Sequence, residues 1–166
     1  MRIEFGRSLG IRLVRKCVER IPGASFTEIR DMTGLSTGST HYAIRRLKIL
    51  GMISEKVFWK NKRYFEPSIQ DEEKKIICVL RNRSARRIIN VLLDNGGVTS
   101  KEVHDTLDIS YPAVRWHLKR LCECRMLTKS TGGTYIIVDR VKIFEVLTRR
   151  NIVDKISNNF GSMWKV

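Results

Sequence analysis

Apolar residues recur every three or four positions in the first third of the chain, and this spacing predicts amphipathic helices. The first such stretch covers residues 5–22, and its apolar positions are Leu9, Leu13, Val14, Cys17, Val18 and Ile21. Ser25 and Glu28 then form a capping-box pattern, which predicts the start of a short second helix. That helix is expected to turn Ile29 and Met32 inward. Gly34 lies in the tight turn that follows, where glycine can adopt a positive φ.

A third amphipathic helix is predicted between Ser36, a favoured N-cap residue, and Gly51, which suits a left-handed helix end. Thr40, Ile44 and Leu47 recur on one face. The opposite face is polar and basic and carries Thr37, Ser39, His41, Tyr42, Arg45, Arg46 and Lys48. Hydroxyl, imidazole, phenol and guanidinium groups suit base edges and phosphate oxygens, so the stretch is typical of a recognition helix. A solvated amphipathic helix is the alternative interpretation.

Two strands rich in β-branched and aromatic residues are predicted after this helix, at residues 52–57 and 63–66. Residues 58–63 between them form a basic and aromatic tip, with Trp59, Lys60, Lys62 and Arg63. Three helices followed by a β-hairpin are the plan of a winged helix-turn-helix domain.

The whole pattern then starts again 74 positions later, after a segment with Pro67 and an acidic cluster that we interpret as a linker. The offset pairs Glu28 with Glu102 and Leu47 with Leu121 without a gap. A repeat that preserves core positions, caps and turns is strong support for two successive copies of one domain. Exposed positions of the second recognition helix and its hairpin are expected to be Tyr111, Arg115, Trp116, Lys119, Arg120 and Lys129.

The expected fold is therefore mainly α with small β-hairpin wings, an α+β arrangement of two tandem winged helix-turn-helix domains plus a C-terminal helix. We place the first domain at residues 1–67, the linker at 68–75, the second domain at 76–139 and the C-terminal helix at 140–166. The apolar face of this last helix includes Phe144, Leu147, Ile152, Ile156 and Phe160. We expect it to mediate dimerisation, with an intramolecular strut or a membrane-surface helix as alternatives.

Charge adds a functional constraint to this architecture. The chain has 166 residues with 32 Lys and Arg against 17 Asp and Glu, a formal net charge of +15 and a pI of about 10.2. Such an excess favours a polyanionic partner, with nucleic acid first and an anionic membrane surface second. No apolar run approaches a membrane span and no signal-peptide core is visible, so we expect a cytoplasmic, nucleoid-associated protein without membrane insertion.

The sequence gives little support for catalysis or metal binding. Cys122 and Cys124 lie near His117, but two cysteines on adjacent turns do not make a four-ligand site. No glycine-rich phosphate loop, acid pair in a turn or nucleophile with a plausible base is apparent. We expect no cofactor, no metal site and no enzymatic activity.

The chain resembles the archaeal tandem winged helix-turn-helix regulators related to the arsenic-repressor and multiple-antibiotic-resistance-regulator superfamily. The resemblance is carried by residues 34–47 with 51–53 in the first copy and by residues 109–121 with 126–127 in the second. Together with the repeat, the net charge and the polar recognition face, this resemblance predicts a sequence-specific regulator of transcription that binds double-stranded DNA. The apolar face of the C-terminal helix predicts that it acts as a homodimer. The expected contacts are the polar and basic residues named above on both recognition helices and both hairpins. A protein-interaction module of the transcription or replication machinery and a sequence-neutral chromatin protein are the alternatives.

Overall fold

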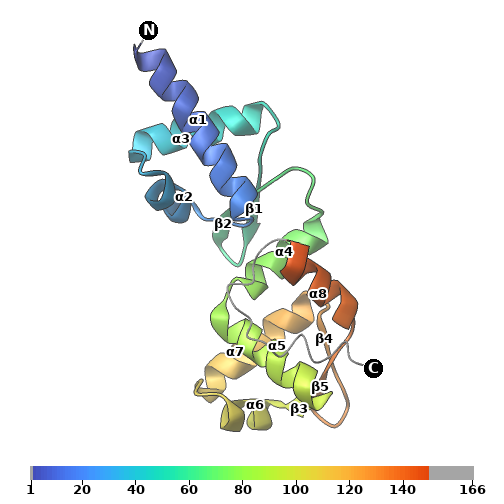
Figure 1. Ribbon diagram of the computed structural model, residues 1–166. Coiled ribbons are helices and arrows are strands. Elements are labelled where there is room, and N and C mark those ends of the chain that lie inside the picture. Colours follow the sequence, from blue (N-terminus) through green and yellow to red (C-terminus); the bar gives the residue numbers. More distant parts are fainter. Residues whose placement is uncertain (1, 150–166) are drawn as a thin grey trace.

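The computed structural model describes residues 2–149, which form two domains in succession along the chain (Figure 1). In the first domain, helices α1 (Arg2–Arg20), α2 (Phe26–Thr33) and α3 (Thr37–Ile49) precede a hairpin of β1 (Ser54–Phe58) and β2 (Asn61–Phe65). The capping box is present, because Ser25 and Glu28 cap the start of α2 reciprocally. Gly34 and Gly51 have φ values of 66° and 65°, as the turn patterns predict.

The core of the first domain forms where α1 crosses α3. Val14, Val18, Ile29 and Leu47 are fully buried. The buried stripe of α1 runs through positions 10, 14, 17 and 18. The predicted inward positions Leu9, Leu13 and Met32 are wrong, because they lie beside the contact faces of their helices and are 44%, 36% and 58% exposed.

The first hairpin is tighter than its sequence suggests. Trp59 and Lys60 alone form the turn between the paired residues Phe58 and Asn61, and both have positive φ values of 48° and 70°. Two left-handed residues are the backbone of the two-residue turn that matches the twist of a hairpin. The predicted tip at residues 58–63 is therefore too wide, because Phe58 lies in β1 and Asn61, Lys62 and Arg63 lie in β2.

The second domain repeats the first with an added helix at each end. Its elements are α4 (Asp71–Leu80), α5 (Arg83–Asn95), β3 (Val98–Thr99), α6 (Ser100–Thr106), α7 (Tyr111–Glu123), β4 (Leu127–Lys129), β5 (Thr134–Ile137) and α8 (Arg140–Arg149). The strands form one antiparallel sheet in the order β3-β5-β4. Helices α3 and α7 begin and end 74 positions apart, and α2 and α6 begin 74 positions apart, so the structure reproduces the offset seen in the sequence.

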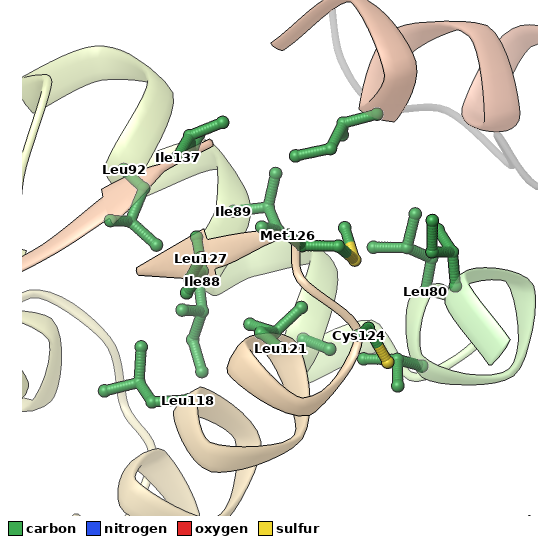
Figure 2. Packing of buried hydrophobic residues seen from close by; sticks show 14 of the residues in the cluster. Leu80, Ile88, Ile89, Leu92, Leu118, Leu121, Cys124, Met126, Leu127 and Ile137 are labelled. Atoms are coloured by element: carbon green, nitrogen blue, oxygen red, sulfur yellow. The ribbon is translucent and has the colours of Figure 1, made fainter. Parts of the chain in front are cut away.

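Helix α4 occupies most of the segment expected to be a linker, and that expectation is wrong from Asp71 onward. Asp71, Glu72 and Glu73 fill its first turn, where negative charge is stabilised by the helix dipole. The acidic cluster that suggests a break in the sequence is thus a helix start. Figure 2 shows Leu80 of α4 facing the same cluster as Leu121 of α7 and Met126.

Helix α8 packs within its own chain over the residues that the structure describes. Ile143 and Val146 are 2% and 5% exposed and belong to the core of the second domain, and α8 contacts α4. This is the strut arrangement for residues 140–149. The side chains of Phe144 and Leu147, and the whole of Ile152, Ile156 and Phe160, lie outside the described residues.

Candidate nucleic-acid interface

The outer face of α3 is polar, basic and open to solvent. The N-cap Ser36 accepts a hydrogen bond from the Ser39 backbone nitrogen at 3.2 Å, and the buried Thr40 donates to the Ser36 carbonyl at 2.9 Å. These bonds fix the first turn and leave the rest of the face outward. The exposed predicted residues are Thr37, Ser39, His41, Tyr42, Arg45, Arg46 and Lys48.

Two of these cations are available to an external anion. Among the described residues, the side chains of Arg45 and Arg46 have no ion-pair or hydrogen-bond partner. Lys48 is engaged by Glu55 at 2.9 Å, and the His41 ring stacks on Phe26 with 4.2 Å between centroids. Helix α3 itself contains no acidic residue, so its outer face carries no negative charge of its own.

The basic residues of the first hairpin have different surroundings. Lys60 is exposed at the turn, whereas Lys62 lies 3.5 Å from Glu55. The hydrogen bond from Lys48 is the main reason that the pKa of Glu55 is lowered, and Lys62 contributes to it. The Lys62 side chain nevertheless remains 65% exposed, so both lysines can approach a phosphate backbone.

Arg63 instead belongs to an ionic cluster between the domains. Its Nη1 lies 3.1 Å from Glu28 Oε2, while Arg81 binds Glu28 Oε1 and also donates to the Pro22 carbonyl at 3.2 Å. Burial by itself would raise the pKa of Glu28, but the hydrogen bonds from Ser25 and the charges of Arg81 and Arg63 lower it overall. One carboxylate therefore caps α2 and joins β2 to the end of α4.

Trp59 connects the first hairpin to the second recognition helix. Its indole nitrogen donates to Glu123 Oε2 at 3.1 Å, and the Arg120 guanidinium lies 4.2 Å from the Trp59 ring centroid. The same guanidinium lies 3.8 Å from the centroid of Trp116. Cation–π contacts of this kind are strongest where water is partly excluded. Arg120 thus contacts Trp59 across the domain boundary and Trp116 on its own helix, and all three are residues predicted to touch DNA.

The remaining predicted residues of the second domain stay on its surface. Arg115, Lys119 and Lys129 are exposed, and the Tyr111 hydroxyl lies 3.0 Å from the Ser100 hydroxyl. Lys129 also lies 5.5 Å from the centroid of the Tyr135 ring. This face therefore retains basic residues at its two ends, while Trp116 and Arg120 occupy its middle beside Trp59 of the first hairpin.

His117 occupies the position that corresponds to Ala43 in the first domain, and it is buried. Its Nδ1 has no hydrogen-bond partner within the described part of the chain. Burial, followed by the charge of Arg120, lowers the pKa of His117. Within residues 2–149, no group of three or more His, Cys, Asp or Glu side chains is arranged to hold a metal ion.

The sequence patterns did not identify the partners that join the domains. The local pattern around Glu28 predicts a helix cap alone, and no local pattern marks Arg81 or Glu123 as a partner. The contacts of these three residues depend on how the first hairpin packs against α4 and α7. The spacing of apolar and polar residues along the chain does not predict that packing. The β1–β2 hairpin reaches from the first domain toward the second in Figure 1.

Comparisons with known proteins also find two successive helix-turn-helix domains in the chain. Residues 11–77 match a family described as an N-terminal HTH domain, and residues 81–127 match a winged helix-turn-helix DNA-binding family. The junction between the matches falls at the end of α4. No curated protein matches the chain.

One similar solved structure is the mRNA-binding domain of the elongation factor SelB from E. coli, determined in complex with SECIS RNA. It is 14% identical, with a TM-score of 0.35, over 78% of this chain and 98% of that one. No helix of the described residues is both long and apolar enough to cross a bilayer. The geometry and the two family matches together show that the chain carries two tandem helix-turn-helix domains of winged architecture, of which the second matches a DNA-binding family.

Proposed function

We propose that the protein is a sequence-specific regulator of transcription that binds double-stranded DNA chiefly through α3. The observation that carries this proposal is the acid-free outer face of α3, with Arg45 and Arg46 unpaired among the described residues. In a major groove, Thr37, Ser39 and Tyr42 would lie near base edges while the two arginines face phosphates. The net charge of +15 supports the same partner.

The proposed interface is narrower than the full set of sequence candidates. Lys60 and Lys62 would reach the DNA backbone from the hairpin of the first domain. Arg115, Lys119 and Lys129 would contribute from the second domain. Trp59 contacts Arg120 across the domain boundary, and Trp116 lies against the same guanidinium. Arg63 shares Glu28 with Arg81 of the second domain. We therefore assign these four predicted residues to domain orientation instead.

The resemblance to archaeal regulators of the arsenic-repressor and multiple-antibiotic-resistance-regulator type supports the regulatory role. We extend the proposal to a homodimer whose subunit contact involves the segment after Arg149, outside the described residues. Light scattering on the full chain tests this: the mass of one chain at micromolar concentration would refute the dimer.

The experiment for the DNA interface compares two double variants by fluorescence anisotropy on a duplex from the region upstream of the gene. Arg45→Ala/Arg46→Ala removes two charges from the proposed face. Arg12→Ala/Lys16→Ala removes two charges from exposed positions of α1 and is the matched control. Each lost phosphate contact should lower the salt slope, d log K/d log[salt], by about 1, so the first variant should lose about 2. The control should keep the slope of the parent.

The same titrations separate the alternatives. A specific regulator should prefer its site over bulk DNA by about 10³ or more. Equal affinity for all duplexes would indicate a sequence-neutral chromatin protein. A duplex Kd no tighter than about 10⁻⁴ M, with a stoichiometric protein partner, would indicate an assembly module. Equal effects of the two double variants would refute the assignment of α3.

A further inference from the structure

A cavity of about 270 Å³ lies between the first hairpin and the second domain. Its walls come from both hairpin strands, Glu28 of α2, the end of α4 and the outer face of α7. The aromatic part of the wall is Phe58, Trp59 and Trp116, and the basic part is Arg63, Arg81 and Arg120. Small-molecule sites are most often concave, partly aromatic and located at domain boundaries.

The cavity carries more positive than negative charge. Glu28 is the only carboxylate of its described lining, and it is shared by Arg63 and Arg81. Arg120 has no ion-pair partner among the described residues, and its guanidinium lies against the indole rings of Trp59 and Trp116. The Glu123 carboxylate, which accepts from Trp59, lies outside the lining and attracts Arg120 without pairing with it. A cation held in place by stacking keeps its N–H edges free to meet an anion.

The aromatic surfaces favour a flat ligand. Trp116 is 48% exposed although it lines the cavity, so one large apolar surface is still accessible to a bound ring. At the volume of about 30 Å³ that each water occupies in the liquid, the cavity holds roughly nine waters. This space suits a single ring with one charged substituent.

We propose that this interdomain cavity binds a small planar organic anion, an aromatic ring that carries a carboxylate or a phosphate. The ring stacks beside Trp116, and the anionic group meets the guanidinium of Arg120. Because Arg120 and Trp116 belong to α7 while Trp59 belongs to the first hairpin, the ligand contacts both domains. Its effect on DNA affinity rests on the proposed function, but its binding does not.

The test uses the full chain without DNA, at constant ionic strength, in a Trp164→Phe background. Trp59 and Trp116 are then the two remaining tryptophans, and both line the cavity. Benzoate and phenyl phosphate should change the tryptophan fluorescence with a Kd of about 1 mM or tighter. The neutral analogue benzamide and the ringless anion acetate should bind at least about tenfold more weakly. A preference for benzoate or for phenyl phosphate identifies the anionic group.

Two matched variants locate the site. Arg120→Gln should weaken binding of the preferred anion by at least about tenfold, because it removes the charge that faces the ligand. Lys101→Gln removes one positive charge from an exposed residue of α6, outside the cavity, and should leave the Kd within about twofold. If circular dichroism shows that the Arg120→Gln variant does not fold, the Trp116→Leu variant tests the site instead, because Trp116 is exposed. It should weaken binding of the preferred anion about as much as Arg120→Gln is expected to.

Several results would overturn the proposal. One is the absence of saturable binding by either aromatic anion, and another is equal affinity for benzamide. Equal losses in the Arg120 and Lys101 variants would also do so, as would unchanged binding in Trp116→Leu. None of these results depends on DNA. A protein that binds the aromatic anion but no duplex keeps the cavity proposal and refutes the proposed function alone.

Discussion

Glu28→Gln tests whether the ionic cluster, and not only the helix cap, stabilises the junction of the two domains. Glu28 Oε2 accepts a hydrogen bond from the Ser25 backbone nitrogen at 2.7 Å and lies 3.1 Å from Arg63 Nη1. Arg81 binds the other oxygen. Glutamine keeps the size of the side chain and an acceptor for the cap, but it removes the charge that both guanidiniums share.

The magnitude follows from how exposed these groups are. The side chains of Glu28, Arg63 and Arg81 are 41%, 26% and 21% exposed. Fully buried charged hydrogen bonds contribute about 1.5–3 kcal/mol each, whereas exposed ion pairs contribute about 0.2–1 kcal/mol. Solvent screening places this cluster near the lower range, so the variant should lose about 1–2 kcal/mol in total. For a chain of this size, that corresponds to a fall in Tm of roughly 2–8 °C.

Glu102 provides the matched control from within the same chain. It is the counterpart of Glu28 at the 74-residue offset and forms the second capping box, with Thr99 at 2.7 Å. Among the described residues it has no arginine partner. Glu102→Gln therefore changes a cap alone, and it should lower Tm less than Glu28→Gln does. Calorimetry at pH 7 measures both.

The pH dependence gives a second readout. Because the pKa of Glu28 is lowered in the folded protein, the charged carboxylate stabilises the fold above its unfolded pKa of about 4.3. That stability is lost as the pH falls through the folded pKa. The difference between the parent and Glu28→Gln should thus shrink as the pH falls below about 4. A Glu28→Gln shift no larger than that of Glu102→Gln, or one independent of pH, would refute the cluster as a stabilising contact.

Further predictions concern three other side chains. Trp59→Ala removes the stacking on Arg120 and the bond to Glu123, so calorimetry should show two separated domain transitions, and an unchanged thermogram would contradict the contact. Burial raises the pKa of Cys78 to about 12, so the reactive thiolate is scarce in the folded chain at pH 8. Mass spectrometry should find that iodoacetamide alkylates Cys78 at least about 100-fold more slowly in the folded chain than in the urea-unfolded chain. Equal rates would contradict this burial. Because the pKa of His117 is lowered in the folded protein, the fold loses stability as the pH falls below about 6.5. In urea titrations, His117→Leu should remove that loss. An unchanged pH profile of the stability would show that His117 is not its source.

The repeat is the part of the fold that could be predicted most fully. Capping residues, turn glycines and the apolar faces of the recognition helices are local signals, because each depends on neighbours within four positions. For this reason Ser25, Ser36 and Gly34 mark the observed boundaries closely. The same local logic failed at Leu9, Leu13 and Met32, since the direction in which a helix packs decides which apolar residues are covered.

For the candidate site, the sequence predicts which kinds of side chain are present better than it predicts how they are arranged in space. The exposed polar face of α3 follows from helical spacing, and its residues are where that spacing places them. The hairpin was different. Its basic and aromatic composition suggested a free wing, yet Trp59 and Arg63 contact α7 and Glu28.

By itself, the sequence determined two winged helix-turn-helix copies, their 74-residue offset and an excess of positive charge. These properties reside in short-range patterns and in composition. Only the tertiary structure decided that α4 joins the second core, that one carboxylate links Arg63 to Arg81, and that Arg120 lies between two indoles. Each of these contacts joins residues that are far apart in the sequence or on different elements. Their side chains meet only because of the way the helices and the hairpin pack in the folded protein, which short-range patterns do not specify.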